Sequence, residues 1–435
     1  MNKLENKWYL YNQVYDLTNF MDNHPGGKTI LELTKNEDDI TATFESYHSL
    51  ANINNIRKIL DKYKISDDGK KQIYTFKNDE FYDICKKRVR QYFTKNIEYD
   101  TSVTHKIKAT PIWYFKSIMI GLLYFYCFVN AFIIENKYDT IYTCLAAFFM
   151  VSNGFCTLHD ASHFALFHQN TYLNELVGRI YNALVCWNHY LWTYRHSYRH
   201  HTYTGTLHLD LDQPLFEMNF INKIPTCLIC PIIFAVTFIF PGSWFYFVLF
   251  SWSEYWYNKI MAISKEYYIV KDFDYIYQKT GDLEKGIVTC MFLCLFYKFN
   301  IMNIAIYIIL SNSFYSLSVE INHETYETLS NECDKATDWG EIQVRNSANF
   351  QINKYYNIYH HLFGGINYQI EHHLFPSMCH IHYPHIAPII QKTCKEFNIP
   401  YQNHSTIISG MSDFYKSFVT NIRNQSQSSL KKKEL

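Results

Sequence analysis

Glycine and proline are scarce in this chain of 435 residues, which has 14 of the first and 10 of the second. A fold of many short strands and tight turns needs more of both, so long helices are expected. Net charge is also lacking, because 40 Lys and Arg balance 40 Asp and Glu. Proteins that hold nucleic acid through its phosphates carry a basic excess, so no nucleic-acid partner is expected.

The cysteines form no framework of disulfides or zinc ligands. Cys227 and Cys230 make a CxxC pair, but the pair lies in an apolar run and is interpreted as small buried or lipid-facing residues. Residues 1–11 are polar and charged, so no secretory signal is expected there and the N-terminal segment is predicted to stay in the cytosol.

Apolar and aromatic residues are abundant, with 48% hydrophobic residues. Ile112–Ile134 carries one charge and is long enough to cross a hydrocarbon core of about 30 Å. Thr140–Leu158 is a second apolar run, and the two predict a hairpin. Thr226–Phe250 and Ile287–Leu310 predict a second hairpin, and Lys298 inside the latter run leaves one span or two pieces as alternatives. The fold class expected is a multi-pass α-helical membrane protein with about four spans.

Two hairpins would leave residues 1–110, 159–224 and 315–435 on one side of the membrane. Basic clusters at 86–90 and 194–199 and in the C-terminal tail mark that side as cytosolic. The regions outside the membrane are therefore predicted to form a cytosolic helical cap.

Residues 1–70 are interpreted as a small soluble module. His24 is followed by Pro25 and two glycines, which allow a tight turn and the close approach of a flat ligand. His48 stands 24 residues later, and both histidines border predicted helices. The simpler alternative is one turn histidine and one surface histidine.

Together with Trp8 and the predicted strand Val14–Leu17, this pattern resembles the cytochrome b5 haem domain over residues 5–65. The resemblance implies a small α+β fold and haem b with His24 and His48 as its two axial ligands. Six-coordinate haem iron has no open position, so such a group carries electrons rather than binding oxygen.

Residues 71–110 are interpreted as a linker rich in Lys and Arg. Phe81, Ile84, Val89 and Phe93 recur at helical spacing. This pattern predicts an amphipathic helix at the membrane surface, and a solvent-exposed charged helix is the alternative.

Histidines gather in three motifs near predicted span ends. His159 and His163 are four residues apart, as are His196 and His200, so each pair shares a helical face. An isolated pair of this kind is usually a surface feature, but three clusters on one side of a membrane suggest a metal site. The candidate ligands are His159, His163, His196, His200, His201, His323, Gln369, His372 and His373.

This set is too large for one zinc ion, which takes three or four protein ligands. It suits two metals of higher coordination number. Imidazole with almost no sulfur fits iron, although zinc and copper also accept imidazole.

The motifs His-Asp-x-x-His, His-x-x-x-His-His and Gln-x-x-His-His resemble those of the membrane fatty acid desaturases. Gln369 and the N-terminal haem module are typical of the front-end subgroup, and the resemblance spans essentially the whole chain. It implies a di-iron centre that activates O2, with the nine candidates as ligands. His323 lies outside the three motifs. Asp160 is expected to orient one of the imidazoles.

The remaining histidines are interpreted as structural or as supporting residues. His360 and His361, just before the third motif, are expected to be structural. A second group is expected on the cytosolic surface: His380, His382 and His385. A third group lies near the motifs and could support the ligands: His168, His189 and His208.

The resemblance implies an oxidoreductase that uses O2 to desaturate a polyunsaturated fatty acyl chain at carbon four, five or six, as a CoA or phospholipid ester. Electrons would come from NADH through a cytochrome b5 reductase and the fused haem module, whose attachment raises its effective concentration. Three alternatives stay open. They are a sphingolipid long-chain-base desaturase acting at carbon eight, a lipid hydroxylase on the same scaffold, and a membrane-anchored electron-transfer haem protein.

Residues 422–435 are polar and expected to be disordered. They end in Lys432-Lys433-Glu434-Leu435, which resembles the dilysine retrieval signal of endoplasmic-reticulum membrane proteins; a lumenal retention address and a plain basic tail are the alternatives. The predicted organisation is a haem module (1–70), a linker (71–110), a desaturase domain (111–421) and a tail, in the endoplasmic-reticulum membrane.

Overall fold

The computed structural model describes residues 6–95, 102–206, 209–210, 212, 235, 279–323, 325, 328, 336–352 and 358–431. The predicted span Thr226–Phe250 apart from Ala235, the pair Cys227 and Cys230, His208 and the final residues Lys432–Leu435 lie outside them.

The N-terminal module is a three-stranded antiparallel sheet with short helices, as the expected α+β fold requires. Its strands, in the order β1-β2-β3, are β1 (Trp8–Leu10), β2 (Gln13–Tyr15) and β3 (Lys64–Ser66). Its helices are η1 (Met21–Asn23), α1 (Thr29–Leu33), α2 (Thr41–Tyr47), α3 (Ile53–Leu60) and η2 (Asp61–Tyr63). The Asn52 side chain accepts a hydrogen bond from the Asn55 N–H and so caps the start of α3.

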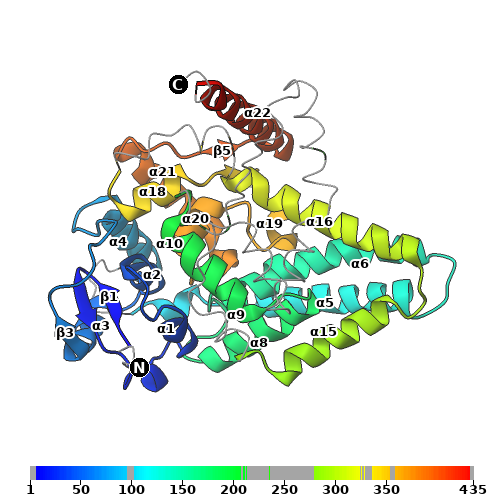
Figure 1. Ribbon diagram of the computed structural model, residues 1–435, viewed down its shortest axis with the longest axis horizontal. Coiled ribbons are helices and arrows are strands. Elements are labelled where there is room, and N and C mark those ends of the chain that lie inside the picture. The colour runs from blue at the N-terminus through cyan, green and yellow to red at the C-terminus, as the bar shows by residue number, and fades with distance from the viewer. Residues whose placement is uncertain are drawn as a thin grey trace.

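Among the described residues, three helical segments are long and apolar enough to cross a membrane. They are Thr104–Phe132, which includes η3 (Thr104–Ile107) and α5 (Pro111–Phe132), Asp139–Ser162, which begins with α6 (Asp139–Asn153), and α16 (Ile301–His323). Helices α5 and α6 form the first predicted hairpin, and α16 packs along α6 (Figure 1).

Of the two alternatives for the apolar run Ile287–Leu310, the structure shows two pieces. α15 (Asp282–Leu295) ends before Lys298, and α16 begins at Ile301. The Lys298 ammonium donates hydrogen bonds to the carbonyls of Ala131 (3.3 Å) and Ile134. The charge inside the apolar run therefore satisfies free carbonyls at the C-terminal end of α5.

A cap of helices covers one end of these long helices (Figure 1). Its helices are α4 (Phe81–Thr94), α8 (Thr171–Leu184), α9 (His189–Trp192), α10 (His201–Tyr203), α18 (Trp339–Arg345), α19 (Ile358–Leu362), α20 (Gln369–Leu374), η8 (His380–His382) and α21 (Tyr383–Glu396). A short parallel pair joins β4 (Asn349–Phe350) to β5 (Asn403–His404). α22 (Ile407–Lys431) packs on α16 and stays helical to Lys431, so the expectation of disorder from residue 422 is wrong up to that point.

Protein, not membrane, covers the apolar face of α4. Phe81, Tyr82 and Val89 are buried in one cluster with side chains of α18, α20 and α21. The Arg88 guanidinium donates to Thr393 Oγ1 of α21 at 2.9 Å. The expectation that this face lies at the membrane surface is therefore wrong, because the cap supplies the apolar partner.

The N-terminal module and the cap share a hydrophobic core. Trp8 and Tyr15 of the module belong to the same buried cluster as Tyr194 and Tyr198 of the cap. Both of those hydroxyls donate to the Glu37 carboxylate, at 3.1 and 3.3 Å. The module is thus packed directly on the cap.

Candidate metal centre

The first histidine motif begins at the end of a π-helical turn and the second lies largely on another, whereas their spacing predicts plain α-helices. η4 (Gly154–His159) continues α6 and leads into α7 (Asp160–Ser162), and η5 (Thr193–His200) leads into α10. Short π-helical turns inside α-helices are frequent at functional sites. Within η5 the rings of His196 and His200 stack with centroids 5.0 Å apart, so this turn keeps both imidazoles on one side.

Two glycines position the third motif against the first. Gly364 and Gly365 have φ values of +57° and +70°. A Cβ atom at Gly364 would lie 2.1 Å from the Phe155 carbonyl oxygen in η4. Only glycine allows this contact between two backbones, and the contact places α20 beside the first motif.

Replacing Gly364 with alanine is expected to destabilise the protein by about 3 kcal/mol or more, because the new methyl group meets backbone that cannot move aside. The thermal unfolding midpoint in detergent measures this. Gly286→Ala is the matched control. Its Cβ would have open space, and the exchange in the middle of a helix should stabilise by about 1 kcal/mol. Equal midpoints for the two variants would contradict the packing argument.

The motifs and His323 come together in two neighbouring groups. In each group, one ligand atom per residue lies within 4.8 Å of all the others. The first group is His159, His163, His196 and His372. The second group is His200, His323 and His373. The His201 ring lies between them, with its centroid 4.6 Å from that of His163 and 4.4 Å from that of His373.

Gln369 belongs to the second group. Its Nε2 lies 2.7 Å from His323 Nε2 and 3.2 Å from His373 Nε2, while its Oε1 is buried with no hydrogen-bond partner. A rotation of the amide by half a turn exchanges these two atoms and puts the oxygen beside the imidazole nitrogens. The structure therefore brings all nine candidates together, including His323.

Most of these imidazoles are held through Nδ1, so that Nε2 remains for a metal. The Nδ1 contacts are His163 to Tyr47 Oη (2.8 Å), His196 to Asp212 (2.7 Å), His200 to Asp210 (2.9 Å), His323 to the Asn346 carbonyl (2.9 Å), His372 to Tyr383 Oη (3.0 Å) and His373 to Gln343 Oε1 (2.9 Å). Metal-binding histidines typically donate their second N–H in this way, which fixes tautomer and ring orientation.

Asp210 and Asp212 are functional candidates that sequence reasoning missed. They stand 10 and 16 residues after the histidines whose Nδ1 they bind. Burial lowers the pKa of His200, but the Asp210 carboxylate outweighs it and the net shift is upward. Hydrogen bonding to His196 and the charge of Arg195 outweigh burial and hold the pKa of Asp212 low. The one available signal was an Asp-x-Asp pair just after the second motif.

Asp160 does not orient a candidate ligand, contrary to expectation. Its carboxylate accepts hydrogen bonds from Trp113 Nε1 at 2.9 Å and Cys379 Sγ at 3.2 Å, and it lies 2.7 Å from His380 Nδ1. His380 Nε2 lies 2.6 Å from the Lys116 ammonium. Asp160 therefore belongs to a buried polar network beside the metal groups.

His380 is fully buried, so its expected surface position is wrong. His382 is half-buried and contacts the Lys108 carbonyl, while His385 is exposed as expected. His168 lies beside Thr104, and His189 lies beside Asn182. Neither His168 nor His189 belongs to the two metal groups.

The cluster of imidazoles is electrostatically suited to metal. Burial, together with the neighbouring histidines, holds the pKa of His163, His201, His372 and His373 well below the usual value. These rings are neutral at pH 7, which is the form that binds a metal. Nε2 of His163, both ring nitrogens of His201 and Nε2 of His372 are buried without a hydrogen-bond partner. Buried polar atoms are rarely left unpaired, so a metal fits this site.

The N-terminal module brings the His24 and His48 rings close together, with an interplanar angle of 64°. Their ring centroids are 6.2 Å apart, and their Nδ1 atoms lie 2.7 Å from the carbonyls of Gly27 and Phe44. This leaves Nε2 of each ring as the atom that would hold a haem iron. A Cβ at Gly26 would lie 2.6 Å from the His24 ring. Burial, reinforced by His48, lowers the pKa of His24 to about 4, so a haem iron fits between neutral imidazoles.

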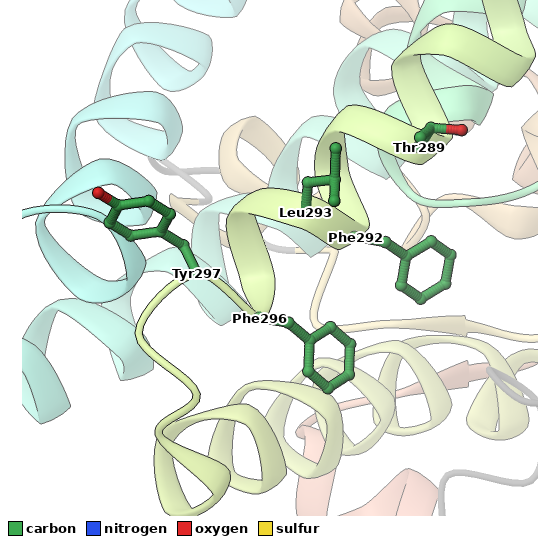
Figure 2. Close-up of a pocket in the computed structure, with 5 residues that line it drawn as sticks. All are labelled: Thr289, Phe292, Leu293, Phe296 and Tyr297. Atoms are coloured by element: carbon green, nitrogen blue, oxygen red, sulfur yellow. The ribbon is translucent and has the colours of Figure 1, made fainter.

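A groove of about 640 Å³ lies away from both histidine sites, on the outer side of α15. Figure 2 shows its lining side chains along the last turns of that helix and just beyond its end: Thr289, Phe292, Leu293, Phe296 and Tyr297. It contains no metal-binding side chain, so the chemistry is not located there.

Comparisons with known proteins agree with this geometry. Residues 140–405 match the fatty acid desaturase family, and residues 1–69 match the cytochrome b5-like haem/steroid binding domain. A probable Delta(5) fatty acid desaturase C of Dictyostelium discoideum is 26% identical and covers 94% of this chain and 88% of its own length. The acyl-lipid (8-3)-desaturase of Physcomitrium patens is also 26% identical, covering 91% and 84%.

A cyanobacterial relative, the sn-1 linoleoyl-lipid 6-desaturase of Synechocystis, is 26% identical over 77% of this chain and 94% of its own length. The desaturase match covers more than half of the chain. The cytochrome b5-like match implies haem, and the desaturase match implies iron. The chain therefore belongs to the fatty acid desaturase family, as an oxidoreductase of the front-end type with an N-terminal cytochrome b5-like domain.

Proposed function

We propose that this protein is an O2-dependent front-end desaturase that introduces a double bond at carbon four, five or six of a long-chain polyunsaturated fatty acyl chain. The observation that carries the proposal is the meeting of nine candidate ligands in two adjoining groups, joined by His201. This arrangement suits two non-haem irons better than one metal ion.

The proposed ligands are the eight candidate residues of the three sequence motifs together with His323, nine in all. The proposed axial ligands of haem b are His24 and His48. The bond to be broken is an unactivated methylene C–H, which no acidic or basic side chain can attack, so iron supplies the activation of O2 when it is bound.

The chain's own residues orient the ligands and exclude water. Nδ1 partners such as Asp210, Asp212 and Gln343 hold the imidazoles so that Nε2 faces inward. The two groups are almost wholly buried, which keeps bulk water away from the reacting carbon. Overall, the acyl chain gives up two hydrogens, a donor gives two electrons and two protons, and one O2 becomes two waters.

The names of the relatives support an acyl-lipid substrate and a front-end position. Proteins named Delta(5), acyl-lipid (8-3) and linoleoyl-lipid 6-desaturases match most of the chain.

The electron route and location complete the proposal. The haem module receives electrons from a reductase that uses NADH. The haem module, the cap and the C-terminus face the cytosol from the endoplasmic-reticulum membrane. The pairing of α5 with α6 as a hairpin, which returns the chain to the end of the long helices that the cap covers, supports a cap that lies on one side (Figure 1).

Expression in a yeast fed eighteen- and twenty-carbon polyenes tests the function. We expect a new double bond between the carboxyl end and the first existing double bond, located by mass spectrometry of derivatised fatty acids. A change only in long-chain bases would favour the sphingolipid alternative. Products with added oxygen would favour the hydroxylase. Purified protein without non-haem iron would favour an electron carrier.

A further inference from the structure

Tyr47 connects the two candidate metal sites. It is the last residue of α2 and directly precedes His48, a proposed haem ligand. Its hydroxyl lies 2.8 Å from Nδ1 of His163, a proposed iron ligand. The two rings are nearly parallel, with an interplanar angle of 17° and centroids 6.2 Å apart. One side chain of the haem module thus reaches the iron-binding groups directly.

The hydrogen bonds around Tyr47 have one consistent direction. The Tyr47 hydroxyl donates to the Ser197 carbonyl at 3.3 Å, so it accepts from the His163 Nδ1–H. With its proton on Nδ1, His163 has the lone pair of Nε2 available, and that Nε2 is buried without a hydrogen-bond partner. Tyr47 therefore selects the tautomer that a metal needs.

The same arrangement occurs at a second ligand of the same group. His372 Nδ1 lies 3.0 Å from the Tyr383 hydroxyl, which donates to the Met378 carbonyl at 3.0 Å. Tyr383 belongs to the desaturase domain, whereas Tyr47 comes from the haem module. Two histidines of one metal group are thus held by equivalent tyrosines, one of them from each domain.

Other contacts hold α2 in place on the cap. Thr43 Oγ1, one turn before Tyr47, lies 2.8 Å from Thr202 Oγ1 of α10. The Tyr203 hydroxyl donates to the Asp39 carbonyl at 3.3 Å. These contacts join the segment that carries Tyr47 to the chain that follows the second motif, so its position does not depend on the His163 contact alone.

We infer that Tyr47 is a positioning residue of the desaturase, supplied by the haem module, that orients His163 for iron and holds His48 beside the iron-binding groups. The inference rests on the proposed function, because it assumes that His163 binds non-haem iron. It makes the haem module part of the metal site as well as the electron donor.

The test compares the wild-type protein with the variant Tyr47→Phe. Both are full-length and are purified with haem and iron bound. The variant keeps the ring and loses the hydroxyl. We expect an iron chelator to remove non-haem iron about tenfold faster than from wild type, since lost partners of metal-bound histidines weaken metal sites by this order. The Mössbauer spectrum of the non-haem iron should change, while the haem absorption spectrum and the unfolding midpoint stay as in wild type.

Two further variants make the result decisive. Tyr383→Phe should accelerate iron loss similarly, and Tyr9→Phe, elsewhere in the haem module, should not. Wild-type iron release and an unchanged Mössbauer spectrum in Tyr47→Phe would overturn the inference for Tyr47 alone. Wild-type protein without non-haem iron would overturn the proposed metal centre and this inference together. Neither measurement requires the substrate to be known.

Discussion

Replacement of His373 by alanine is expected to abolish desaturation and to lower the content of non-haem iron. His373 Nε2 lies 3.1 Å from His323 Nε2, and its Nδ1 is held by Gln343. Because the ring is fully buried among other candidate ligands, its removal leaves both a cavity and an incomplete ligand set. We expect product formation to fall by more than about a hundredfold, since even the loss of a partner outside the ligand set costs ten- to a hundredfold.

Product is measured by gas chromatography of fatty acids, and iron by elemental analysis of the purified variant. His385→Ala is the control, because this histidine is exposed on α21 and belongs to neither metal group. It should keep wild-type activity and iron. Near-normal product from the His373 variant would exclude it as a ligand, whatever the iron content.

The ligand set could be predicted from the sequence because each motif is local. His159 with His163, and Gln369 with His372 and His373, lie within one or two turns, so spacing alone indicates a shared face. The π-helical turns changed the local geometry but not the outcome. His323 was included as a candidate although it lies outside the three motifs, and α16 brings its ring to His373.

The groups that support the ligands could not be predicted in this way. Asp210 and Tyr47 reach their histidines through packing between separate elements, and no periodicity marks such contacts. His380 was misplaced for the same reason. It was expected on the cytosolic surface, yet the packing of α5 buries it beside Lys116 and Asp160.

The helices, too, could be predicted only as far as their features depend on a single segment. Apolar run length predicted α5 and α6 well, because a span is a property of one segment. It could not locate the break between α15 and α16, since Lys298 is accommodated by carbonyls at the end of another helix. The apolar pattern also could not show that α4 would pack within the cap, because a helix with one apolar face fits either a membrane or a protein core.

Replacement of His24 by alanine is expected to remove haem and to abolish desaturation supported by NADH and a reductase. His24 Nδ1 is tied to the Gly27 carbonyl, so its Nε2 is the atom available for the iron. Without it, the haem site keeps only His48. Electrons then cannot reach the metal centre through the module, and we expect turnover of the purified protein to fall by about a hundredfold or more.

Iron analysis separates this effect from damage to the desaturase domain. The His24 side chain belongs to neither iron-binding group, so the variant should retain its non-haem iron while it loses the haem absorption band. Asp22→Asn is the control, since its side chain lies two residues earlier and is 84% exposed. Full turnover by haem-free His24→Ala with NADH and reductase would show that electrons bypass the module, and its role would then be the docking contact made by Tyr47.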